Sequence, residues 1–199
     1  MDIEYIKNNY KFETLTEKHD LSKFKCDSKD LNEFLRKDAL NQQKEKLNIT
    51  KLMICDNEII GFVTLLTDSL KLKVVRDENI KELIKNELNI SEKNNIASVK
   101  IGRYAIDSKY SNKGLGSFIL RNIIDNINDL SKKDVGIRFI IVEGYAKAYY
   151  FYVDKMGFIN LKKDDKILKN IDFITQKDPE RTFFLYLDLI FPQVHYLLD

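Results

Sequence analysis

The sequence predicts a single α/β domain, and three observations support this. The 199 residues include 44% apolar residues, enough for one well-buried core and too few for two full domains. An apolar strand, a turn with two glycines and an amphipathic helix follow one another over residues 98–128. Ile137–Val142 is then a nearly continuous apolar run, typical of a strand buried on both faces of a sheet. This order of elements forms a βαβ unit, for which a right-handed crossover is expected.

Two elements are predicted near the start of the chain. Tyr10–Leu15 alternates apolar and polar residues, as a half-buried strand does. Asp30 and Glu33 form the pattern of a helix-starting cap, and the apolar residues that follow share one helical face as far as about Lys46. The charged residues on the other face of this helix are expected to be solvated.

A hairpin and a charged insertion are predicted next. Ile49–Cys55 and Ile59–Leu66 are rich in β-forming residues and flank a short polar turn, so they should pair. The insertion, Lys71–Asn95, is highly charged and carries one helical stripe of apolar residues, namely Ile80, Leu83, Ile84 and Leu88. This stripe indicates either a helix packed on the body of the protein or a lid.

The last third of the chain contains an aromatic helix and a final strand. Ala146–Met156 is predicted to be a short helix that Gly157 ends with a left-handed cap. Phe158–Ile159 resumes as a strand, Lys162–Asn170 is polar and typical of a loop, and Thr182–Leu189 is the final strand. One domain over 1–199 is therefore expected, with its core at about 10–189.

Charge and composition exclude several classes of function. The net charge is +2, so the total demands neither nucleic acid nor an acidic membrane surface. Cys26 and Cys55 have no companion at metal-ligand spacing, which argues for reduced thiols and against a metal site. No signal peptide and no stretch approaching about 18 apolar residues is present, which predicts a cytoplasmic protein with no membrane partner.

The glycine turn has the features of an anion site. Gly114 and Gly116 let the main chain approach a ligand closely, and the helix that they open directs unpaired N–H groups to the same place. A diphosphate fits such a site. The spacing G-x-G is weak evidence by itself, since a turn that needs glycine only for steric reasons has the same pattern.

The order of elements and the glycine turn resemble the Gcn5-related N-acetyltransferase family over about Phe12 to Leu189. The family signature is Arg or Gln, two further residues, Gly, one residue, then Gly or Ala. Ser111–Gly116 fits this signature except that Ser111 stands in the first position. The resemblance implies a twisted, mixed and mostly antiparallel sheet of about six to seven strands flanked by helices, with acetyl-CoA as cosubstrate.

The resemblance also implies which residues hold the coenzyme. The pantetheine arm would hydrogen-bond to the main chain of the strand before the loop, as an added strand does. The diphosphate would bind the N–H groups of the loop, to which Lys109 and Lys113 could add charge. The coenzyme-binding residues implied are Tyr104, Ala105, Ile106, Ser111, Asn112, Lys113, Gly114, Leu115, Gly116 and Ser117.

A tyrosine would protonate the leaving thiolate, because the family uses the Tyr of a Phe-Tyr pair before Gly-Phe. Phe151-Tyr152 matches this pair, and a phenol with a pKa of about 10 is protonated at neutral pH. The family commonly has three residues between this Tyr and the Gly, whereas here there are four. One residue rotates a helix by about 100°, so Tyr149, nearly on the same face as Tyr152, is the alternative. No general base is identifiable; Glu143 at a strand end is a candidate only through water.

The acceptor is open at this stage. A narrower likeness, in residues 24–35 and 101–107, is to the branch that includes toxins acetylating aminoacyl-tRNA and many relatives of unassigned substrate. The expected function is an acyltransferase that moves an acetyl group from acetyl-CoA to the primary amine of a small molecule or peptide. The alternatives are a toxin with tRNA as its partner and a non-catalytic CoA-binding module. The apolar tail, Ile190–Leu198, fits either a homodimer contact or a strand on the same sheet.

Overall fold

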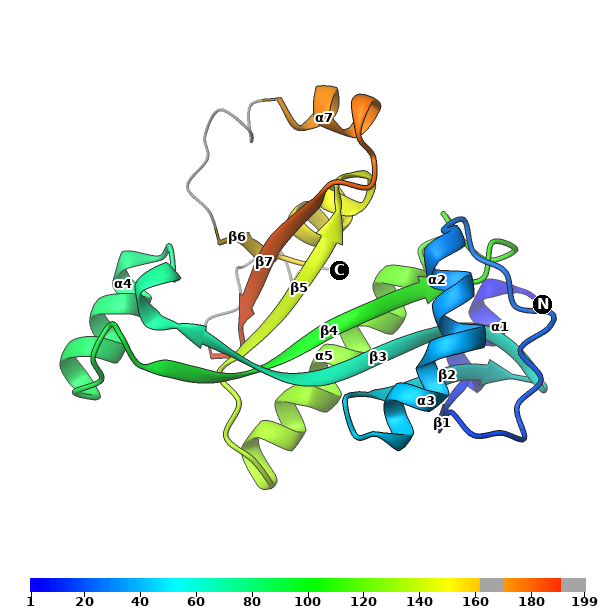
Figure 1. The fold of residues 1–199 in the computed structure, drawn as a ribbon, viewed down its shortest axis with the longest axis horizontal. Helices are drawn as coiled ribbons and strands as arrows, with labels where there is room; N and C mark the ends of the chain where they lie inside the picture. The colour runs from blue at the N-terminus through cyan, green and yellow to red at the C-terminus, as the bar shows by residue number, and fades with distance from the viewer. Residues whose placement is uncertain (162–169, 191–199) are drawn as a thin grey trace. The chain divides into compact units, whose positions relative to one another are not determined.

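The computed structural model describes residues 1–161 and 170–190 (Figure 1). Seven strands form a sheet in the order β1-β2-β3-β4-β5-β7-β6, and helices flank it, which confirms the predicted α/β class and strand number. The residues group into two compact units. The first comprises Met1–Leu66 and Ile101–Ile124, and the second comprises Thr67–Lys100 and the described residues from Asp125 onward.

The first unit begins with α1 (Ile3–Asn9), a helix that the sequence analysis did not predict. The Asp2 carboxylate caps it by accepting hydrogen bonds from the N–H groups of Glu4 and Tyr5. Ile6 is the buried residue of this helix. A single anchor in seven residues leaves no apolar stripe, so its helical period is hard to recognise in sequence.

Three antiparallel strands follow: β1 (Lys11–Thr14), β2 (Ile49–Cys55) and β3 (Glu58–Lys71). They confirm the predicted first strand and the hairpin. The hairpin turn is Asp56-Asn57, with φ of 47° and 64°. Two consecutive residues with positive φ are what a two-residue type I′ turn requires, and Asn and Asp tolerate this conformation best after glycine.

The helical layer of the first unit starts with α2 (Lys29–Glu33), which continues through a π-helical turn into α3 (Ala39–Lys44). The predicted cap was wrong by two residues, because the Ser28 hydroxyl accepts the hydrogen bond from the N–H of Leu31. Asp30 lies in the first turn, where its charge favours the helix dipole. Buried side chains of these turns pack with those of β2 and β3 in one core, which includes Phe24, Phe34, Leu35, Ala39, Leu52, Ile54 and Phe62.

The remaining elements of the first unit are the end of β4 (Asn95–Ile106) and the start of α5 (Leu115–Lys133). β3 and β4 are neighbours in the sheet. They approach so closely at Gly61 that a Cβ there would lie 2.6 Å from the carbonyl oxygen of Ala105. Side chains from α5, among them Leu115, Ile119 and Ile123, are buried as the predicted helix requires.

The second unit contains β5 (Phe139–Tyr145), β6 (Ile159–Asn160) and β7 (Thr182–Asp188), with β7 antiparallel to both. All three were predicted, but β5 begins two residues later and ends three residues later than expected, and β6 begins one residue later. The helix α7 (Ile171–Lys177) was not predicted. The predicted loop, apart from residue 170, and the tail from residue 191 lie outside the described residues.

The charged insertion forms α4 (Glu78–Glu82) and a π-helical turn, Leu83–Glu87. Ile80 and Ile84 are buried in a core with Phe139 of β5 and Tyr186 of β7. The packed-helix interpretation of the insertion is therefore confirmed. Within residues 1–161 and 170–190, no helix has the length and hydropathy needed to cross a membrane.

Candidate active site

The loop between β4 and α5 takes the backbone form that the sequence predicted. Asn112 and Gly114 have φ of 58° and 79°, and the carbonyl of Gly114 accepts the first helical hydrogen bond, from the N–H of Phe118 at 3.3 Å. A Cβ at position 114 would meet nothing within 4 Å. The glycine is therefore needed for its left-handed conformation and not for space.

Backbone donors gather where this loop opens α5. The N–H groups of Gly114–Ser117 belong to the first turn of α5 and have no acceptor within the helix. Asn112, Lys113 and Gly114 are exposed, and α5 extends over 19 residues from this end. A helix N-terminus carries a partial positive charge, so the loop has the donors and the field to bind an anion such as a diphosphate.

Asp107 fixes the start of the loop. Its buried carboxylate accepts hydrogen bonds from the N–H groups of Lys25 and Lys109, both at 3.0 Å. Its carbonyl accepts from the N–H of Tyr110 at 2.9 Å, and its own N–H donates to the carbonyl of Ile60 at 2.8 Å. Four hydrogen bonds from one residue hold the loop to β3 and to the segment before α2.

The two lysines considered for phosphate contact are engaged within the protein. The Lys109 ammonium pairs with Glu58, and this hydrogen bond holds the pKa of the Glu58 carboxyl below its usual range. The Tyr110 hydroxyl donates to the same carboxylate at 3.2 Å. The Lys113 ammonium donates to the carbonyl of Lys109 at 2.8 Å. We call the N–H groups of the loop and of the first turn of α5 the cradle. The cradle consists of main-chain donors, because both lysine ammonium groups are hydrogen-bonded within the protein.

Tyr104, Ala105 and Ile106 are the last residues of β4, directly before Asp107 and the loop. The Tyr104 hydroxyl donates to the carbonyl of Gly116 at 2.6 Å. This bond ties the end of the strand to the first turn of α5. The strand expected to bind the pantetheine arm and the loop expected to bind the diphosphate are therefore joined by a hydrogen bond within the first unit.

The predicted catalytic tyrosines lie in the second unit. Tyr152 is buried, its ring packs edge-on against Phe151 and Phe158, and a Cβ at Gly144 would lie 3.0 Å from the Tyr152 ring. Burial raises the pKa of Tyr152 far above its ordinary value, so the phenol keeps its proton at neutral pH. Tyr149 is also buried, against Phe183.

A π-helical turn accounts for the extra residue between Tyr152 and Gly157. The turn spans Phe151–Lys155, and the N–H of Phe158 donates to the carbonyl of Tyr152 at 2.9 Å. Gly157 has φ of 70°, as predicted for a left-handed cap. A π-helical turn contains about one residue more than an α-helical turn. It therefore accommodates the four residues between Tyr152 and Gly157, where the family commonly has three.

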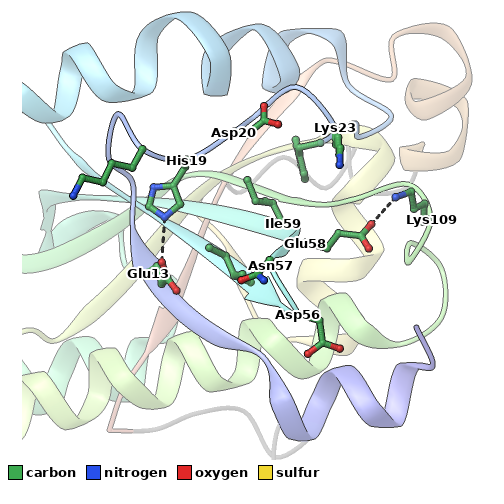
Figure 2. Close-up of a pocket in the computed structure, with 12 residues that line it drawn as sticks. Glu13, His19, Asp20, Lys23, Asp56, Asn57, Glu58, Ile59 and Lys109 are labelled. Carbon is green, nitrogen blue, oxygen red and sulfur yellow. Dashed lines mark hydrogen bonds and ion pairs between the residues drawn. The ribbon is translucent and has the colours of Figure 1, made fainter.

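The first unit also has a cavity of about 600 Å³ beside the Asp56-Asn57 turn (Figure 2). It is lined by Glu13, Lys18, His19, Asp20, Lys23, Phe24, Ile54, Asp56, Asn57, Glu58, Ile59 and Lys109. His19 Nε2 lies 3.1 Å from Glu13 Oε2, and the Glu58 to Lys109 pair closes the opposite side. The sequence analysis missed this cavity because its lining is dispersed between residues 13 and 109 without a spacing motif.

Over residues 1–161 and 170–190, no three His, Cys, Asp or Glu side chains are grouped so that they could hold a metal ion. Cys26 and Cys55 are buried and neither forms a disulfide within the described residues. Burial raises the pKa of the Cys55 thiol, which makes it a poor nucleophile.

Comparison with solved structures identifies the fold. A tyrosine-to-phenylalanine mutant of KacT matches with a TM-score of 0.71 and 20% identity, over 92% of this chain and 96% of that chain. AtaT complexed with acetyl-methionyl-tRNAfMet matches with a TM-score of 0.68 and 22% identity, over 88% and 94%. The chain has the fold of these proteins. AtaTR bound with AcCoA is similar at a TM-score of 0.67 and 24% identity, over 92% and 95%.

The likeness lies in structure, and the sequence identity to these proteins is only 20–24%. No protein-family model matches the chain, and a search of curated proteins finds no match. The fold implied by the resemblance to Gcn5-related N-acetyltransferases is confirmed, since KacT and AtaT have this fold.

Proposed function

We propose that the protein is an acetyl-CoA-dependent N-acetyltransferase. The observation that carries the proposal is the row of N–H groups at Gly114–Ser117, which open a 19-residue helix and have no acceptor within it. This is a binding surface for a diphosphate, the group that joins the nucleotide of acetyl-CoA to its pantetheine arm. The similar AtaTR structure holds AcCoA.

In the proposed reaction the neutral amine attacks the carbonyl carbon of the thioester, the C–S bond breaks, and the thiolate takes up a proton from Tyr152. The proton that the nitrogen loses as the amide forms passes to solvent, from which the tyrosinate is reprotonated. The loop binds the diphosphate, and the main chain of Tyr104–Ile106 binds the pantetheine arm. Tyr152 donates the proton to the sulfur. Its raised pKa ensures that the proton is present before negative charge develops on the sulfur.

We propose aminoacyl-tRNA as the acceptor, in place of the small-molecule or peptide amine that the sequence favoured. The similar AtaT structure contains acetyl-methionyl-tRNAfMet, which is the product of such a transfer. The chemistry agrees with this choice. An α-amino group has a pKa of about 7.7–8.0, compared with about 10.4 for lysine, so roughly a tenth of it is neutral at pH 7, against less than about a thousandth of lysine. Such an acceptor does not need a strong general base, and the sequence analysis identified none beyond Glu143 acting through water.

The test is transfer of label from radioactive acetyl-CoA to total aminoacylated tRNA by the purified protein. We expect label in the tRNA fraction, and its loss after mild alkali releases the amino acid from the tRNA. Free amino acids and lysine-containing peptides are the competing acceptors. Label on these alone would support the small-molecule or peptide amine that the sequence analysis expected as acceptor. Absence of label on every acceptor would refute the proposed acetyltransferase activity.

A further inference from the structure

Glu58 binds two consecutive side chains of the loop between β4 and α5. It is the first residue of β3 and directly follows the Asp56-Asn57 turn. Its Oε1 atom pairs with the Lys109 ammonium (Figure 2), and its Oε2 atom accepts a hydrogen bond from the Tyr110 hydroxyl at 3.2 Å. Each oxygen of this carboxylate therefore has its own partner on the loop.

The backbone of β3 brings Glu58 to this position. Gly61 of β3 lies against Ala105 of β4. One residue earlier on β3, the carbonyl of Ile60 accepts a hydrogen bond at 2.8 Å from the N–H of Asp107, which follows β4. Residues earlier on β3 therefore lie beside residues later in the loop, so Glu58 faces the residues that follow Asp107.

The two partners of Glu58 differ in their surroundings. The Lys109 and Glu58 side chains are 61% and 31% exposed, and an ion pair in water contributes little by itself. Tyr110 is buried, and a hydrogen bond from a phenol to a charged carboxylate is stronger than one between neutral groups. The hydrogen bond between Lys109 and Glu58 lowers the pKa of Glu58 and raises that of Lys109, so both are charged at neutral pH.

We infer that Glu58 is a positioning residue for the coenzyme, which acts by holding the loop in the form that binds the diphosphate. This inference rests on the proposed function. Lys109 and Tyr110 directly precede residues 111–114, in which Asn112 and Gly114 have φ of 58° and 79°. A ligand that must first order a loop binds more weakly than one that meets the loop already ordered. Anchoring Lys109 and Tyr110 leaves only this short segment to be ordered by acetyl-CoA.

The experiment measures the Kd for acetyl-CoA by calorimetry on purified variants of the full chain. Glu58→Ala removes both acceptor oxygens and should raise the Kd about fivefold. Glu58→Gln keeps one acceptor for the Tyr110 hydroxyl and should raise it only about twofold. The kcat at saturating acetyl-CoA should equal that of wild type in both variants, because bound coenzyme orders the loop again.

The matched control is Glu13→Ala. Glu13 lines the other side of the same cavity (Figure 2), where its carboxylate pairs with Lys11 and His19 and with no residue of the loop. The Kd of this variant should stay within about 1.5-fold of wild type, the usual consequence of removing an exposed ion pair. An equal increase in Glu13→Ala and Glu58→Ala would refute a specific role for Glu58.

A second set of variants tests whether Glu58 acts through its two partners. Lys109→Met combined with Tyr110→Phe removes both donors and should reproduce the Kd of Glu58→Ala. Adding Glu58→Ala to this double variant should then change the Kd by less than about 1.5-fold, since groups in one network are not additive. A further fivefold loss would show that Glu58 affects coenzyme binding by another route, which overturns the inference.

The outcomes separate this inference from the proposed function. If the wild type binds acetyl-CoA and Glu58→Ala binds it equally well, the positioning role is refuted and the proposed function stands. If Glu58→Ala weakens binding as expected but the wild type acetylates no acceptor, the positioning role stands and the acetyltransferase is refuted. If the wild type does not bind acetyl-CoA, both are refuted.

Discussion

The Tyr152 ring lies directly against Gly144, where a Cβ would be 3.0 Å from both the Cδ2 and the Cε2 atoms of the ring. Contacts this short force one neighbour to move by a few tenths of an ångström. Gly144 is hydrogen-bonded within the β5 and β7 ladder, opposite Phe183. A side chain at position 144 would therefore displace the Tyr152 ring, so the observed position of the ring requires glycine there.

Gly144→Ala should lower the kcat of acetyl transfer by about tenfold, since a displacement of about 1 Å in a catalytic group can cost about a hundredfold. The Kd for acetyl-CoA should stay unchanged, because the coenzyme loop is in the other unit. Steady-state kinetics on the tRNA acceptor gives the first value and calorimetry gives the second. The control is Gly136→Ala, where a Cβ meets nothing within 4 Å. Equal kcat in both variants would show that the position of the Tyr152 ring is unimportant for the reaction.

Tyr152→Phe and Tyr149→Phe separate the two candidate acids. We expect Tyr152→Phe to lower kcat by about 10²- to 10⁴-fold, the usual contribution of a general acid, without weakening acetyl-CoA binding. Tyr149→Phe should change kcat by less than about threefold, since its ring packs on Phe183 in a structural contact. The reverse pattern would assign the proton to Tyr149. Full biological function in the double variant would support the non-catalytic module.

The buried phenol of Tyr152 also predicts how stability depends on pH. Its pKa is raised on folding, so the folded protein holds a proton that the unfolded chain loses above about pH 10. This contribution is complete below pH 10 and is lost as the pH rises toward the folded pKa, at up to about 1.4 kcal/mol per pH unit. Urea unfolding between pH 9 and 11 should show a shallower decline for Tyr152→Phe than for wild type. Identical slopes would mean that Tyr152 titrates normally.

The left-handed turn at Gly114 predicts a defect in coenzyme binding. An alanine at φ of 79° costs about 1–2 kcal/mol, and the loop will relax toward an ordinary conformation to reduce this strain. The N–H groups would then point in new directions, so Gly114→Ala should raise the Kd for acetyl-CoA about five- to thirtyfold. Gly136→Ala again serves as the control. Tight binding by Gly114→Ala would show that the cradle does not require this backbone conformation.

Local chemistry predicted those parts of the fold whose signals lie close together in sequence. The Asp56-Asn57 hairpin, the glycine turn and the cap at Gly157 depend on the backbone preferences of one or two residues, and the structure has all three. α1 and α7 were missed because each buries a single described residue, Ile6 or Ile171, and forms no apolar stripe. Ser and Asp stabilise a helix N-terminus by amounts that differ by less than about 1 kcal/mol. The sequence therefore does not show whether Ser28 or Asp30 caps the helix.

The candidate site was predictable in its main chain and less so in its side chains. The donors at Gly114–Ser117 depend on a helix start, which glycine marks in the sequence. The pairing of Lys109 with Glu58 connects residues 51 positions apart and has no local signal. The π-helical turn at Phe151–Lys155 cannot be predicted from a period of 3.6 residues, so the position of Tyr152 relative to Gly157 needed coordinates.

The last prediction concerns Asp107, which connects the loop to its surroundings. Each carboxylate oxygen accepts one backbone N–H, from Lys25 or from Lys109, and the side chain is buried. An asparagine has the same shape but only one acceptor oxygen, so its amide group must face one of the two donors. Leaving a buried N–H without an acceptor costs about 1–3 kcal/mol.

Asp107→Asn should therefore lower the free energy of unfolding in urea by about 1–3 kcal/mol. It should also raise the Kd for acetyl-CoA, because the freed N–H belongs to the segment before α2 or to the loop itself. Asp68→Asn is the matched control, since Asp68 is exposed and caps only the N–H of Ser69 among the described residues. Loss of stability with unchanged coenzyme affinity would show that Asp107 supports the fold without shaping the cradle, whereas a parallel loss of both would connect the two through its carboxylate.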